Sequence, residues 1–286
     1  MIEAMKHFLL VALFAAAAFA EKPFQVKVTG HGRPMILIPG LSSSGETWDT
    51  MVAHYQDRFE CHVLTVAGFA GVPRIASPML ESVRDGVAAY VQEQKLVKPV
   101  IVGHSLGGFL ALAIAAKYPD LPGKLVIVDA YPFLSAVYDP KITLEEARSN
   151  AATTRQYMNQ SQDMYERYVK SGMATRMMVT SDAGLERLIA WGLASDRTAV
   201  TDAMVEMLTT DLRGEVGRIQ CPTLVLGTWI GFKEYTDQAK TEANFKSQYA
   251  ALAGVEIHVS DTSRHFIMWD DPQWMFARTD RFLNAQ

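Results

Sequence analysis

Short apolar runs alternate with segments of helical periodicity along most of this chain. The runs are rich in β-branched residues, which is typical of buried strands. They lie at residues 24–28, 35–38, 63–66, 100–102, 125–128, 223–226 and 255–259. Segments with apolar positions at helical spacing lie at residues 47–58, 79–94, 109–118 and 273–283. Strands that alternate with helices predict an α/β fold with a mostly parallel, doubly wound sheet.

The middle of the chain breaks this alternation. From residue 141 to residue 213 the pattern is helical, contains no strand signal and is rich in methionine. Methionine is flexible and unbranched, which suits either a lid over varied apolar ligands or filler between helices. We therefore expect a helical insertion over residues 138–213, between two parts of one core at residues 21–137 and 214–286.

The most informative motif is Gly103-His-Ser105-Leu-Gly107, which has a predicted strand before it and a predicted helix after it. A strand that turns into a helix within one residue leaves no room for side chains two positions away, and the glycines supply that room. The serine hydroxyl is then exposed beside the N-terminus of the helix, where N–H groups and the helix dipole converge. We predict that Ser105 is a nucleophile. The alternative is a glycine-rich turn that only packs the helix on the strand.

In this motif and its context, the chain resembles the α/β-hydrolase family from about Phe24 to the C-terminus. The resemblance implies a helical cap inserted after the family's sixth strand, and a triad in the chain order serine, acid, histidine. His265 is the expected base, because HFIMWDDP at residues 265–272 follows the last strand and is similar to the family's histidine segment. The resemblance also implies that the backbone N–H groups of Leu41 and Leu106 form an oxyanion hole.

The acid of the triad is open between several positions. The family usually carries it three residues beyond a glycine that corresponds to Gly227, where this chain has Ile230. Asp129, at the end of a buried strand, matches the position that a subset of the family uses. Glu234 and Asp237 lie further along the loop after Gly227 and are the alternatives. We favour Asp129, because a strand end holds a carboxylate more firmly than a long loop does.

The N-terminal sequence and the net charge restrict the expected cellular location and the classes of binding partner. Lys6 and His7 precede an apolar stretch at residues 8–19, and Ala18-Phe-Ala20 resembles a cleavage site, so residues 1–20 are expected to be a secretory signal peptide. The mature protein would then be periplasmic or secreted, without stable membrane association. An uncleaved membrane anchor is the alternative. The net charge of −4 and the absence of a basic run argue against nucleic-acid binding.

These features predict a serine hydrolase, and first of all a carboxylesterase that cleaves a small-molecule ester through an acyl-enzyme. No metal or cofactor is implied, and the oligomeric state is not predicted. Trp229, Phe266 and Met268 lie near the predicted site and indicate an apolar acyl or alcohol group, although core packing would also explain them. An amidase, a lactonase, a carbon–carbon bond hydrolase and a non-catalytic ligand-binding protein of the same fold are the alternatives.

Overall fold

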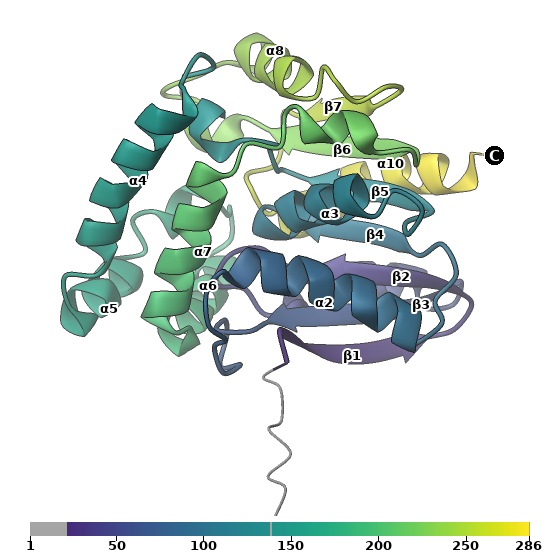
Figure 1. Ribbon diagram of the computed structural model, residues 1–286, viewed down its shortest axis with the longest axis horizontal. Coiled ribbons are helices and arrows are strands. Elements are labelled where there is room, and N and C mark those ends of the chain that lie inside the picture. The colour runs from purple at the N-terminus through teal and green to yellow at the C-terminus, as the bar shows by residue number, and fades with distance from the viewer. Residues whose placement is uncertain (1–21, 138, 286) are drawn as a thin grey trace, which may run out of the picture.

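The computed structural model describes residues 22–137 and 139–285, which form a seven-stranded sheet with helices on both faces (Figure 1). The strand order is β1-β3-β2-β4-β5-β6-β7; β1 pairs antiparallel with β3, and the other pairs are parallel. The predicted α/β class is therefore confirmed. The predicted signal peptide, residues 1–20, lies outside the described residues. The strands are β1 (Phe24–Gly30), β2 (Arg33–Ile38), β3 (Phe59–Val66), β4 (Val100–His104), β5 (Lys124–Val128), β6 (Thr223–Thr228) and β7 (Glu256–Ser260).

The strands divide the core into two layers, because successive side chains of a strand point to opposite faces. On β2, Ile36 and Ile38 enter one apolar cluster, whereas Met35 and Leu37 enter the other. The first cluster includes side chains of α2 (Met79–Glu93), α3 (Leu106–Lys117) and α8 (Gln238–Gln248), and the second includes those of α1 (Asp49–Tyr55) and α10 (Pro272–Asn284). Burial on both faces explains why the successive residues Val100, Ile101 and Val102 of β4 are all apolar.

The predicted elements differ from the structure at their ends, and two helices show why. The helix expected at residues 47–58 begins as a 3₁₀ turn, Gly45–Trp48, and continues as α1 only to Tyr55. The side chain of Ser44 accepts a hydrogen bond from the backbone of Glu46, and this cap starts the turn two residues early. The helix expected from Phe109 begins three residues earlier, because α3 starts directly after Ser105.

Between β5 and β6 the described residues form helices and no strand. The longest are α4 (Leu144–Met158), α5 (Gln162–Ser171), α6 (Asp182–Ala194) and α7 (Arg197–Thr209) (Figure 1). We call these four helices, with the segments that connect them, the cap. Each begins at a side chain that accepts a hydrogen bond from a backbone N–H of the first turn, which explains where the helices start. The capping residues are Thr143, Ser161, Ser181 and Asp196. The domain boundaries at residues 138 and 213 stay a prediction.

The cap is joined to the sheet layers by a carboxylate. Glu206 of α7 accepts hydrogen bonds from the backbone N–H groups of Met79 and Leu80, at 2.9 and 2.7 Å. These N–H groups begin α2, where Pro78 provides no side-chain cap. The cap therefore supplies the hydrogen-bond acceptor for the free N–H groups at the start of a core helix. No helix in the described part of the chain is both long enough and apolar enough to cross a membrane.

Candidate active site

Ser105 lies in the sharp connection between β4 and α3. Its backbone φ of 53° and ψ of −118° are unusual for a residue with a side chain. Its N–H donates to the carbonyl oxygen of Val128 at 2.9 Å, which anchors it to β5. A Cβ atom on Gly103 would lie 2.1 Å from the carbonyl oxygen of Gly107, and one on Gly107 would lie 2.1 Å from that of Ile38. Only glycine fits at either position, for the steric reason that the motif predicts.

Asp129 and His265 form a close polar pair beside this connection. Asp129 is the first residue after β5, and its Oδ2 lies 2.5 Å from Nδ1 of His265. Its Oδ1 accepts a hydrogen bond from the backbone N–H of Thr228 at 3.1 Å, which fixes the carboxylate from the neighbouring strand. A carboxylate on Nδ1 sets the tautomer of the imidazole and leaves Nε2 free to accept a proton.

The other candidate acids do not contact His265 within the described residues. Glu234 is exposed in the loop after β6. Asp237 accepts a hydrogen bond from the backbone N–H of Lys240 at 2.8 Å and so caps α8. Ile230 begins a short 3₁₀ turn in the same loop. The structure brings Asp129, and neither alternative, to the histidine.

The loop that carries His265 is held from several sides. The hydroxyl of Thr228 donates to the carbonyl oxygen of Ser263. On either side of His265, the backbone N–H of Arg264 donates to Asp270 at 2.9 Å, and that of Phe266 donates to a carbonyl oxygen of the cap at 3.1 Å. Together these bonds compensate for the lack of a strand here, since β7 ends at Ser260.

The predicted oxyanion donors lie on two converging segments. Leu106 is the first residue of α3, and Leu41 follows Gly40 just after β2. A Cβ atom on Gly40 would lie 3.3 Å from that of Ser105, so this loop is close to the serine. Within residues 22–137 and 139–285, neither leucine N–H donates a hydrogen bond to a protein group. Both amides are therefore unpaired donors close to Ser105, that of Leu41 in a partly buried residue and that of Leu106 in a fully buried one.

The cap reaches the loop after β2 through Tyr165 of α5, a residue that the sequence did not single out. Its hydroxyl donates to the carbonyl oxygen of Gly192 at 3.0 Å. Burial raises the pKa of Tyr165, and the nearby side chain of Ser42 partly offsets this rise. Ser42 has a φ of 55°, and it directly follows Leu41. No local pattern connects positions so far apart in the sequence.

The residues predicted to bind substrate have different surroundings. Trp229 is partly exposed after β6. Phe266 is only 3% exposed, with its ring centroid 4.6 Å from that of Trp269, and Met268 is fully buried. These two side chains therefore present little or no surface to solvent. The structure places Phe266 and Met268 in the core under the His265 loop, which agrees with the core packing that the sequence left open as their role, and substrate contact with them stays a prediction.

Burial controls the ionisation of two further groups at the site. Burial, and then the nearby His265, hold the pKa of His104 well below its ordinary range. Burial and the negative charge of Asp129 raise the pKa of Tyr249 well above its ordinary range. The hydroxyl of Tyr249 donates to the carbonyl oxygen of Ala130 at 2.9 Å. Both side chains are therefore neutral near pH 7.

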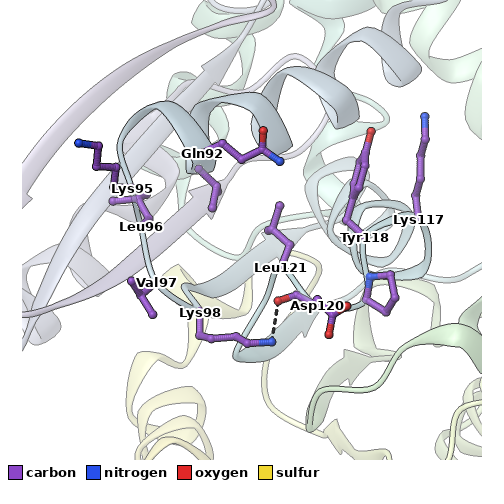
Figure 2. Close-up of a pocket in the computed structure, with 11 residues that line it drawn as sticks. Gln92, Lys95, Leu96, Val97, Lys98, Lys117, Tyr118, Asp120 and Leu121 are labelled. Carbon is purple, nitrogen blue, oxygen red and sulfur yellow. Dashed lines mark hydrogen bonds between the residues drawn. The ribbon is translucent and has the colours of Figure 1, made fainter.

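A surface groove of about 690 Å³ lies away from this site (Figure 2). Its walls come from the C-terminal ends of α2 and α3 and from the segments that precede β4 and β5. The groove therefore lies at the N-terminal ends of these strands, whereas Ser105 lies at the C-terminal end of β4. Lys98 donates to the backbone oxygen of Asp120 across it at 2.6 Å (Figure 2). Among the described residues, no group of three or more His, Cys, Asp or Glu side chains is placed to hold a metal ion.

Comparisons with known proteins point to one family. A model described as "Alpha/beta hydrolase family" matches residues 35–278. A pimeloyl-(acyl-carrier protein) methyl ester esterase of Nitrosospira multiformis is 24% identical over 266 residues, which cover 90% of this chain and 97% of that protein. A Rhizobium rhizogenes protein whose name proposes carbamate hydrolysis is 24% identical over 273 residues, which cover 91% and 97%. The solved structure of an esterase from Exiguobacterium antarcticum is 15% identical with a TM-score of 0.74, and the match covers 92% of this chain and 96% of that one.

Proposed function

This chain belongs to the alpha/beta hydrolase family, and we propose that it hydrolyses carboxylic esters through Ser105, His265 and Asp129. The observation that carries the proposal is the 2.5 Å contact between Nδ1 of His265 and the carboxylate of Asp129, next to a serine held in a strained backbone conformation. A serine hydroxyl needs such a paired base to become a nucleophile near neutral pH.

The proposed reaction proceeds in two stages. Nε2 of His265 takes the proton of the Ser105 hydroxyl as its oxygen attacks the carbonyl carbon of the ester, and it then gives that proton to the departing alcohol. Water attacks the resulting acyl-enzyme by the same route, with His265 again accepting the proton, and the acid is released. Asp129 stabilises the imidazolium that forms in each stage.

The negative charge on the carbonyl oxygen needs its own donors. The backbone N–H groups of Leu41 and Leu106 are proposed to bind this oxygen, because they are unpaired within the described residues and lie on segments next to Ser105. Loss of one such donor in a related hydrolytic site costs about 10²–10³ in rate. The side chains of the two leucines serve only by leaving these amides uncovered.

The names of similar proteins favour esters over amides as the substrates of this protein. The methyl ester esterase and the solved esterase both act on esters by name, while the protein named for carbamate hydrolysis keeps a carbon–nitrogen bond as the second candidate. We also propose, from residues 1–20 alone, that the protein is secreted or periplasmic. The N-terminal sequence of protein recovered outside the cytoplasm tests this: a start at Glu21 supports it.

Hydrolysis of p-nitrophenyl esters of increasing acyl length tests the proposed activity, with lactone, amide and carbamate substrates alongside. Ser105→Ala is expected to lower kcat by about 10³-fold or more and to abolish labelling by a fluorophosphonate. Ser82→Ala, an exposed serine on α2, is the matched control and is expected to leave both unchanged. A Ser105→Ala protein that keeps most of its activity contradicts the assignment of the nucleophile.

A further inference from the structure

His104 is a buried side chain that lies beside the proposed base and directly precedes the proposed nucleophile in the chain. It is the last residue of β4, it directly precedes Ser105, and it is 1% exposed. Its ring centroid lies 4.5 Å from those of His265 and Phe266. Its Nε2 lies 3.1 Å from the carbonyl oxygen of His265. A polar atom of a fully enclosed side chain therefore contacts the backbone of the base.

The surroundings of His104 determine where its proton lies. A carbonyl oxygen only accepts hydrogen bonds, so Nε2 must carry the hydrogen. Burial and the neighbouring His265 disfavour a second proton, so the ring is neutral. The remaining Nδ1 has no hydrogen-bond partner among the described residues and faces Gly40, where an added Cβ would lie 3.0 Å away. His104 is thus a donor through one atom, and that atom points at the base.

His265 depends on such a donor more than the other two proposed catalytic residues. Ser105 and Asp129 donate their backbone N–H groups to neighbouring strands, at 2.9 and 2.7 Å, and are anchored in the sheet. His265 lies five residues beyond the end of β7. Within residues 22–137 and 139–285, the Nε2–H of His104 is the only group that donates to its carbonyl oxygen.

We propose that His104 is a positioning residue for the hydrolytic reaction. Its Nε2–H fixes the carbonyl group of His265 and thereby sets the imidazole of the base relative to the hydroxyl of Ser105. This inference rests on the proposed function of both residues. His104 is enclosed, and its hydrogen bond to the base is made to the backbone of His265. Because a displacement of about 1 Å can lower a rate about 10²-fold, its loss is expected to appear in kcat and to leave KM unchanged.

Two substitutions separate the donor from the ring. His104→Phe keeps an aromatic ring without a donor, and His104→Gln keeps an N–H at a similar reach. Kinetic constants on a p-nitrophenyl ester are divided by the number of sites that a fluorophosphonate labels at completion, so that unfolded protein does not count. We expect His104→Phe to lower kcat per labelled site about 10–100-fold with KM within about twofold, and His104→Gln to recover most of the loss.

Trp48→Phe is the matched control, because Trp48 also packs edge-on against the His104 ring, while its indole N–H has no hydrogen-bond partner among the described residues. It is expected to lower the unfolding temperature while kcat per labelled site stays within about twofold of wild type. The inference is overturned if His104→Phe also keeps wild-type kcat per labelled site, or if His104→Gln is no better than His104→Phe.

A measurement on the unaltered protein covers the case in which His104→Phe does not fold. Nitrogen-15 NMR of the histidine rings should show one ring that keeps a proton on Nε2 and none on Nδ1 from pH 8 to pH 5. A His104 that titrates in this range, or that carries its proton on Nδ1, overturns the inference. If the wild type neither hydrolyses nor labels, the proposed function is wrong, and the NMR result still decides whether the hydrogen bond to His265 exists.

Discussion

Phe266 donates its backbone N–H to the carbonyl oxygen of Met178, 3.1 Å away, and so joins the residue after the proposed base to the cap. On the other side of the base, the guanidinium group of Arg264 donates to the carbonyl oxygen of Val179 at 3.0 Å. Both chain neighbours of His265 are therefore bonded to one short segment of the cap. A movement of that segment must displace the base as well.

Asp270→Asn is predicted to loosen this connection. One carboxylate oxygen of Asp270 accepts hydrogen bonds from the backbone N–H and the hydroxyl of Thr180, at 3.0 and 2.6 Å, and the other accepts from the N–H of Arg264. The side-chain NH₂ group of asparagine, in the place of either carboxylate oxygen, would face a hydrogen-bond donor and could not accept from it. We expect unfolding to need about 1.5–3 kcal/mol less free energy, measured in urea, and kcat/KM on the best ester to fall about tenfold.

Asp182→Asn is the control for that variant, because Asp182 pairs with Arg176 of the same segment but is 82% exposed at its side chain. Exposed pairs contribute little, so the unfolding free energy should change by less than about 0.5 kcal/mol. Equal losses in the two variants would mean that the connection through Asp270 has no special role.

Asp129→Asn is predicted to lower kcat about 10⁴-fold while the protein stays folded, because an amide beside Nδ1 of His265 no longer sets the tautomer or stabilises the imidazolium. Asp237→Asn and Glu234→Gln should remain within about twofold of wild type, since neither side chain contacts the histidine. Steady-state kinetics on one ester, with circular dichroism to check folding, distinguishes them. A large loss in Glu234→Gln with a small one in Asp129→Asn would move the acid to the loop after β6.

Gly107→Ala is predicted to prevent correct packing of the turn around Ser105. The added methyl group would meet the backbone oxygen of Ile38 at 2.1 Å, and a backbone atom cannot rotate away. We expect a loss of about 3 kcal/mol or more in the free energy of unfolding, or insoluble protein. Gly214→Ala is the control, because nothing lies within 4 Å of its added Cβ atom. Comparable stability of the two variants in urea would contradict this reading of the turn.

Stability is predicted to depend on the charge of His104 in acid. The pKa of His104 is lowered by burial and then by His265, so the folded protein does not take up this proton when the unfolded chain does, below about pH 6.5. Unfolding is thereby favoured by up to about 1.4 kcal/mol for each pH unit below that value. His104→Gln should therefore show a shallower fall in unfolding free energy between pH 7 and pH 5. Identical slopes would show that His104 takes up its proton while folded.

Patterns within a few residues of the sequence predicted the strands of the sheet and the turn that carries Ser105. Apolar runs marked all seven strands, although the strands extend beyond the predicted runs, β3 by four residues at its start, and the last is displaced by one residue, from 255–259 to Glu256–Ser260. The reason is that buried strands must be apolar on both faces, which leaves a mark within a few residues. The steric need for glycine on both sides of Ser105 is equally local, and the structure places those glycines against backbone oxygen atoms.

Contacts between distant segments could not be predicted. The sequence identified Asp129 as one of three candidate acids, but only the neighbouring strand shows that Thr228 holds its carboxylate against His265. The bonds from the cap to Arg264 and Phe266 join residues more than 80 positions apart. The apolar residues Phe266 and Met268, close to the base in the sequence, suggested a substrate-binding surface, whereas tertiary packing buries both side chains.

Ser105 and Asp129 both have positive backbone φ values, of 53° and 45°, which residues other than glycine rarely adopt. Such conformations cost on the order of 1–3 kcal/mol each. The two residues proposed to act together therefore oppose the stability of the chain that holds them. A laboratory selection for thermal resistance alone is expected to favour glycine at both positions, as at other residues with positive φ such as Ser42, and so to remove the activity while stabilising the fold. Directed evolution of this protein needs selection for turnover in every round.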